Sequence, residues 1–148
     1  MHKSLPRMLF LALEICTVMR ACLDPRANDR TAHSPDRHTL ESTSRYVLGA
    51  LVVALGLERA SRQHAEPPAE EQQRWRRRFH QTVTRLRAAG IATAENTGEA
   101  WASYRGQRDE WESKLHQLAA YLGYEWEEIT GDRDLDNAAQ EEQESAPA

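Results

Sequence analysis

Residues 99–123, EAWASYRGQRDEWESKLHQLAAYLG, carry the clearest helical pattern in the chain. Large apolar side chains recur there at alternating spacings of three and four, and one charged residue, Arg108, falls within the series. The seam consists of Trp101, Tyr104, Arg108, Trp111, Leu115, Leu118 and Leu122. Such seams are typical of antiparallel helical bundles and of coiled coils. The segment therefore predicts a long helix that ends at Gly123.

Three more helices are expected before this one. Pro6 follows Ser4 as the first turn of a helix that continues to Leu23, where Asp24-Pro25 ends it. Residues 26–37 are polar and predict a loop. Ser34-Pro35 then begins a second helix that extends to about residue 63. Because residues 47–57 are apolar on nearly every face, we expect this second helix to lie at the centre of the fold.

The third helix is expected over residues 69–89, with Gly90 as its stop signal. A narrow apolar stripe marks its buried face, made of Trp75, Phe79, Val83 and Leu86. Together these patterns predict an all-α fold, specifically a four-helix, mainly antiparallel bundle.

Charge is distributed unevenly along the 148 residues, whose formal net charge is -4. Residues 125–148 contain nine acids and one base, so the first 124 residues carry a net charge of +4. The length suits one domain with its own core. We therefore expect a bundle domain over residues 1–130, followed by a disordered acidic tail over residues 131–148.

Two apolar stretches are too short for membrane spans, which need about 20 residues. Residues 8–23 include Glu14 and Arg20, and residues 46–57 number only 12. The two cysteines, Cys16 and Cys22, are six residues apart on one expected helix, which favours free thiols over a disulfide bond. These features favour a cytoplasmic protein.

No sequence motif supports catalysis or metal binding. The chain lacks a Gly-rich phosphate loop, a nucleophile elbow, and His or Cys residues at metal-ligand spacing. Glu14 is an acid within an apolar helix, and we expect it either to snorkel toward solvent or to form an interhelical pair, rather than to have a catalytic role. We expect no enzymatic activity, no cofactor, no metal and no small-molecule substrate.

The basic cluster Arg74, Arg76, Arg77 and Arg78 has two interpretations. The arginines could contact phosphates while neighbouring aromatic rings stack on bases, as in a nucleic-acid-associated helical protein. Alternatively, Trp75 and Phe79 face the core and the arginines face solvent. The isoelectric point near 5.9 favours the second interpretation, and nucleic acid is not the partner we expect.

Arg108 interrupts the apolar seam and also has alternative roles. A lone charge in a seam can set register or oligomeric state, and the seam residues could then form a self-association surface. Arg108 could instead reach Glu112 or an acid on a facing helix, or lie at the rim with its stem on apolar surface.

Three segments carry a resemblance to a known family. They are residues 11–24 (LALEICTVMRACLD), residues 45–58, and residues 98–111 (GEAWASYRGQRDEW), the last continuing to LAAYL at residues 118–122. In order and spacing, residues 11–126 resemble the cytoplasmic helical region that follows the pore in bacterial two-helix potassium-channel-like proteins. The resemblance implies a non-enzymatic assembly or regulatory module at the inner face of a membrane. Its implied partners are further copies of the chain and a membrane-associated channel protein or pore region.

This chain lacks the family's Thr–Val–Gly–Tyr–Gly filter, and we do not expect it to conduct ions by itself. The family's ion-contacting residues lie in the pore, so the resemblance assigns no role to any single residue of this sequence.

Overall fold

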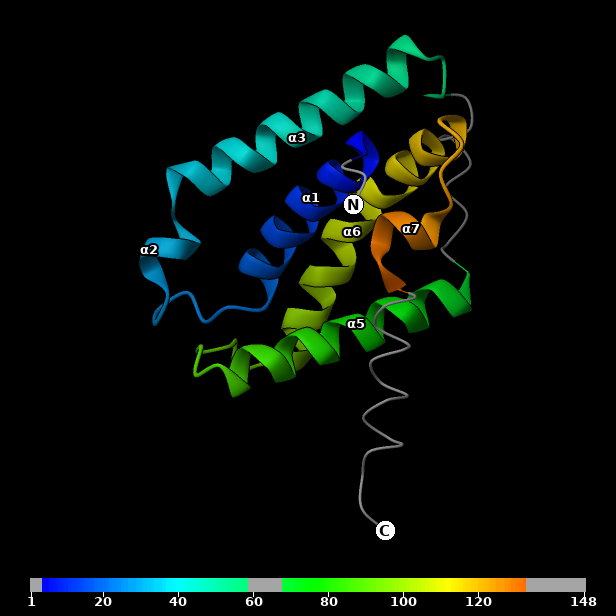
Figure 1. Ribbon diagram of the computed structural model, residues 1–148. Coiled ribbons are helices and arrows are strands. Elements are labelled where there is room, and N and C mark those ends of the chain that lie inside the picture. The colour runs from blue at the N-terminus through cyan, green and yellow to red at the C-terminus, as the bar shows by residue number, and fades with distance from the viewer. Residues whose placement is uncertain (1–3, 59–67, 133–148) are drawn as a thin grey trace.

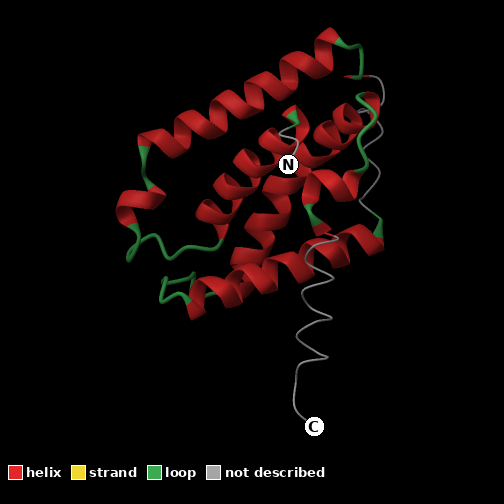
Figure 2. Cartoon of the chain, viewed as in Figure 1, coloured by secondary structure: helices red, strands yellow, loops and turns green. Residues whose placement is uncertain are grey.

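The computed structural model describes residues 4–58 and 68–132, and within them the regular structure is helical (Figure 2). Four long helices are α1 (Leu5–Ala21), α3 (Pro35–Ala54), α5 (Ala69–Ala88) and α6 (Thr97–Tyr121). Within the described ranges, shorter helices are α2 (Asp29–Ala32) and α7 (Trp126–Thr130). The predicted all-α bundle of four mainly antiparallel helices is confirmed. Of the predicted acidic tail, residues 133–148 lie outside the described part of the chain.

Helices α1 and α6 lie side by side at the centre, with α3 along one side and α5 along the other (Figure 1). The two central helices run antiparallel, because Glu14 of α1 contacts Arg108 while Trp111, further along α6, contacts Phe10. The expectation that residues 47–57 form the central helix is wrong. Helix α3 covers its neighbours with one face only, and Tyr46 and Val53 remain exposed.

Local signals set most helix ends where the sequence predicts them. The Ser4 and Ser34 hydroxyls accept hydrogen bonds from backbone N–H groups in the first turns of α1 and α3. Helices α5 and α6 end just before Gly90 and Gly123, which adopt φ values of 76° and 79°.

Helix α3 ends earlier than predicted. Gly56, with φ of 69°, stops it near residue 54 rather than 63, because glycine adopts a left-handed conformation without steric cost.

Two short helices fall where the sequence predicted none. Helix α2 lies within the expected loop of residues 26–37, and α7 follows Gly123. Helix α7 contributes Ile129, which is almost fully buried, and Trp126 packs its ring edge-on against Phe10. The C-terminal part of the described chain therefore belongs to the core.

The core has two clusters, and α1 and α6 contribute to both. The first lies between α1, α3, α6 and α7 and contains Leu9, Phe10, Leu13, Leu48, Val52, Trp111, Leu115, Leu118, Ala119 and Ile129. The second joins the end of α1 to α5 and the start of α6 and contains Ala21, Cys22, Trp75, Phe79, Val83, Ala100 and Tyr104. Among the described residues, no helix combines the length and apolar character that crossing a bilayer requires.

Candidate functional site

A buried ionic network links the two central helices. The Nη1 atom of Arg108 lies 3.2 Å from Oε2 of Glu14, and its Nη2 atom lies 2.6 Å from Oε1 of Glu112. Tyr104 donates a hydrogen bond of 2.6 Å from its hydroxyl to Oε1 of Glu14. All four residues are buried. The predicted interhelical pairing of Glu14 is confirmed, and Arg108 reaches both acids that were considered for it: one on its own helix and one on the facing helix.

Aromatic rings enclose the Arg108 guanidinium. Its central carbon lies between 5.4 and 5.7 Å from the ring centroids of Phe10, Trp75, Tyr104 and Trp111. Ring faces attract cations most strongly where water is excluded. These rings therefore help to offset the cost of removing the guanidinium from water.

The single positive charge of Arg108 is shared by two buried carboxylates, those of Glu14 and Glu112. Several groups in the network have shifted pKa values as a result of this arrangement and of their burial. Burial raises the pKa of Glu112 to about 7, although the Arg108 charge acts in the opposite direction. Burial alone would lower the pKa of Arg108, but Glu14, Tyr104 and Glu112 outweigh it and hold that pKa well above its ordinary value. Burial also raises the pKa of Tyr104. A negative charge on Glu112 is therefore costly at neutral pH.

The network leaves no room for an organic substrate. Three of its polar atoms, Nε1 of Trp75, Nε of Arg108 and Oε2 of Glu112, have no partner within the described protein. The cavity that these three residues help to line has a volume of about 10 Å³, the space of one water molecule. No group of His, Cys, Asp and Glu residues in the described ranges could hold a metal ion. The buried ionic network therefore suits a structural role, in which it holds α1 and α6 together.

The seam predicted for self-association faces the core of its own chain. Tyr104, Arg108, Trp111, Leu115 and Leu118 are buried against the neighbouring helices, and Trp101 is half-buried. Only Leu122, at the end of the seam, is exposed. A second copy could reach this seam only if α6 left its own core.

Trp75 and Phe79 are buried and Arg74, Arg76 and Arg77 are exposed, as the second interpretation predicts. Arg78 departs from it, because its side chain is only 14% exposed. Arg78 forms an ion pair with Asp132 and donates a 2.8 Å hydrogen bond to the carbonyl of Thr130. Nη1 of Arg74 lies 4.0 Å from Glu127, and the guanidinium of Arg76 lies 5.3 Å from the ring centroid of Trp101. Arg77 is exposed but also interacts within the chain.

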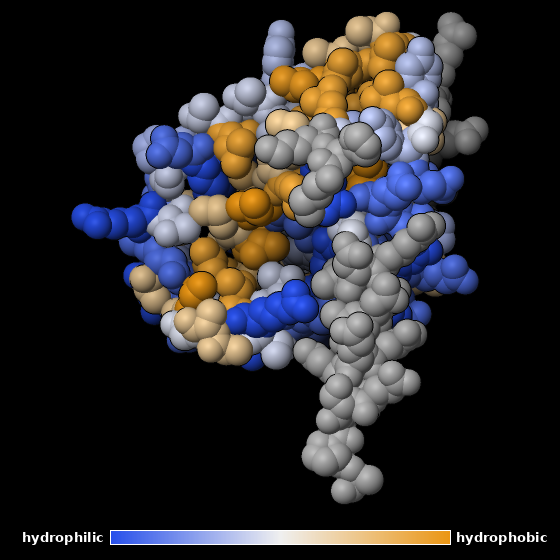
Figure 3. Space-filling view, in the orientation of Figure 1, coloured by the Kyte–Doolittle hydropathy of each residue, from blue (hydrophilic) through white to orange (hydrophobic). Residues whose placement is uncertain are grey.

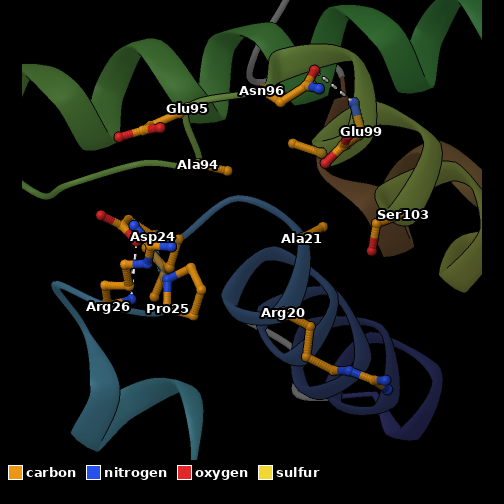
Figure 4. Close-up of a pocket in the computed structure, with 12 residues that line it drawn as sticks. Arg20, Ala21, Asp24, Pro25, Arg26, Ala94, Glu95, Asn96, Glu99 and Ser103 are labelled. Carbon is orange, nitrogen blue, oxygen red and sulfur yellow. Dashed lines mark hydrogen bonds between the residues drawn. The ribbon is translucent and has the colours of Figure 1, made fainter.

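An open cleft of about 430 Å³ lies where the end of α1 meets the start of α6 (Figure 4). Arg20 and Arg26 line it together with Asp24, Glu95 and Glu99, so its wall mixes both signs of charge. Arg20 is already paired with Glu41 at 2.8 Å. No motif in the sequence predicted this cleft, because its walls come from segments about 70 residues apart.

An exposed apolar face is the other surface feature of note. Leu5, Met8, Leu11 and Ile15 follow one another at spacings of three or four along α1, and each is between 43% and 56% exposed. On α3, the exposed apolar residues are Leu40, Tyr46 and Val53. Figure 3 shows apolar side chains gathered over α1 in the middle of the view and over the end of α3 at the upper right.

We name the exposed residues Leu5, Met8, Leu11 and Ile15 the α1 apolar face. The sequence signalled it only indirectly, since an apolar helix does not reveal which of its sides will be left uncovered.

The chain matches no family model, no curated protein and no solved structure. A functional proposal for this chain therefore depends on its own structure and sequence.

Proposed function

We propose that this chain is a non-enzymatic helical assembly module that associates with further copies of itself. The α1 apolar face carries this proposal. Removing apolar surface from water is the main favourable contribution to most protein–protein association. Large contiguous apolar patches are rare on proteins that remain monomeric, and they commonly mark interaction sites.

A second copy is the occupant that this geometry favours. An aliphatic stripe at spacings of three and four presents ridges that fit into the grooves of an identical stripe across a two-fold axis. The acid of this helix, Glu14, is turned into the core, so no carboxylate of α1 would be buried at the interface. Arg108 and most of the seam on α6 are buried inside the chain and cannot contact a second copy. The α1 face is thus the better surface for self-association.

Sedimentation equilibrium tests the proposal. The unchanged chain should form a concentration-dependent oligomer, and the Leu11→Ser/Ile15→Ser variant should be monomeric with unchanged helical circular dichroism. Ile91→Ser and Leu122→Ser are matched controls, because both residues are exposed and apolar but lie elsewhere. A chain that stays monomeric at about 100 μM, in the weak range for association, would contradict the proposal. So would an oligomer that only Leu122→Ser disrupts, which would return the interface to the end of the seam.

The resemblance to the cytoplasmic region of bacterial two-helix potassium-channel-like proteins also suggests where the module is located and what it binds. The module would then lie at the inner face of a membrane and assemble beside a pore region. The DNA upstream of the Met1 codon provides a test. An in-frame pair of long apolar helices with a filter sequence supports this extension, and a native N-terminus at Met1 without such a sequence opposes it.

Association with nucleic acid through Arg74, Arg76, Arg77 and Arg78 is the alternative function. It has less support, because three of these arginines already contact acids or a ring of the same chain. Binding to duplex DNA that weakens steeply with salt and disappears in the four-alanine variant would favour it.

A further inference from the structure

Helix α5 presents a face that is rich in arginine. Residues 72–88 contain six arginines and no acid. Arg74, Arg78 and Arg85 are spaced by four and seven residues, so they project from one side of the helix. We call these three residues the α5 arginine face. Helix α5, which carries this face, packs on the other side of the central helices from α3 (Figure 1).

The C-terminal part of the described chain already places acids on this face. Glu127 lies 4.0 Å from Nη1 of Arg74, and Asp132 pairs with Arg78. Burial would raise the pKa of Asp132, but the charge and hydrogen bond of Arg78 outweigh burial and lower it. The contact with Arg78 therefore favours the ionised form of Asp132. Asp132 is the last described residue, and it lies at this face.

The remaining segment complements the face in charge. Residues 133–148 contain five acids and one base, which gives them a net charge of -4. We propose that residues 133–148 bind along the α5 arginine face from Arg78 toward Arg85 and compete there with other polyanions. The chain would then carry its own competitor for the basic surface.

The distances allow this contact. Arg78 and Arg85 are seven residues apart on a helix that rises 1.5 Å per residue, so the segment must travel only about 10 Å. Sixteen residues can extend to roughly 50 Å. Exposed ion pairs are individually weak and are screened by salt. The contact should therefore be reversible, held by several acids together, and weakened at high ionic strength.

Paramagnetic broadening in the full-length chain tests the contact directly. A nitroxide attached through Ala146→Cys should broaden the amide signals of residues 81–88, and 0.5 M salt should restore them. The native Cys16 and Cys22 will not compete for the label, because both are buried and burial raises the pKa of each thiol, that of Cys22 to about 12. Arg85→Gln should reduce the broadening.

Two results would overturn the proposal. One is an absence of broadening on α5 at low salt. The other is broadening that neither salt nor Arg85→Gln changes, which would indicate contact through another surface.

Affinity for heparin tests the competition. The variant Glu141→Gln/Glu142→Gln/Glu144→Gln should elute from heparin at clearly higher salt than the unchanged chain. The matched control is Asp36→Asn/Glu99→Gln/Asp109→Asn, which changes the net charge equally at exposed positions on α3 and α6. Equal elution of the two variants would refute competition, because net charge alone would then explain the result.

Discussion

The Arg108 guanidinium on α6 lies 3.2 Å from the carboxylate of Glu14 on α1, 94 residues earlier in the chain. This contact joins the two central helices at a point where water is excluded. A buried charge that loses its partner is far more costly than an exposed one. The pair therefore makes the packing of α1 on α6 depend on a specific alignment of the two helices.

Removing the arginine should be severely destabilising. Arg108→Met leaves Glu14 and Glu112 buried without their cation, and we expect a loss of about 3–5 kcal/mol in the free energy of unfolding. Urea denaturation provides the measurement. Lys114→Met, an exposed change on the same helix, should alter stability by less than about 0.5 kcal/mol. Adding Glu14→Gln and Glu112→Gln to Arg108→Met should restore much of the loss, and failure of that rescue would assign the effect to lost packing.

Stability should fall as the pH rises from about 4.5 to about 7. The pKa of Glu112 is raised from 4.5 to about 7 in the folded chain, so the folded state holds a proton that the unfolded state releases. Its contribution is thus complete below pH 4.5 and is lost as the pH rises through 7. Each pKa unit corresponds to about 1.4 kcal/mol, which makes the expected decrease on the order of 3 kcal/mol.

Thermal or urea denaturation across this pH range measures the slope. Glu112→Gln should flatten it, whereas Glu110→Gln, at an exposed neighbour, should leave it unchanged. Equal slopes for the unchanged chain and Glu112→Gln would show that Glu112 is not the titrating group.

The hydroxyl group of Thr17 should contribute more to the free energy of unfolding than the volume of its side chain does. Its Oγ1 accepts a 3.2 Å hydrogen bond from Nε1 of Trp111 and donates a 2.8 Å bond to the carbonyl of Leu13. Thr17→Val keeps the shape but leaves the buried indole N–H unpaired, at a cost of about 1–3 kcal/mol. Thr17→Ser should retain most of the stability. If the valine and serine variants unfold at the same urea concentration, the hydrogen bond contributes little.

Two glycine-to-alanine changes should alter the free energy of unfolding in opposite directions. Gly123 adopts φ of 79° after α6, so alanine there should cost about 1 kcal/mol. Gly106 lies inside α6, and alanine there should stabilise the chain by about 0.5–1 kcal/mol. An added methyl group meets no atom within 4 Å at either site, so the comparison isolates backbone conformation. The same sign at both positions in thermal melts would contradict this explanation.

Local sequence signals predicted the four long helices, but not the end of α3, the short helices α2 and α7, or which helices pack together. Ser34-Pro35, Gly90 and Gly123 marked helix ends correctly because capping and left-handed glycine act within a few residues. The contact between Glu14 and Arg108 depends on which helices become neighbours, so spacing could not identify it as a specific pair.

The expectation that the apolar second helix lies at the centre is wrong for a related reason. Hydrophobicity indicates that a helix can be buried, whereas topology decides how much of it is covered. Helix α3 packs against α1 and α6 and leaves Val53 exposed. For the same reason, only the three-dimensional arrangement shows which side of α1 is left exposed.

The rings around Arg108 belong to both parts of the core. Phe10 and Trp111 come from the first cluster, and Trp75 and Tyr104 from the second. Detachment of α5 would remove the Trp75 ring from the guanidinium and open the ionic network to water, so it would weaken the first cluster as well. The two clusters should consequently open together in native-state hydrogen exchange, as one cooperative unit rather than as two independent subdomains.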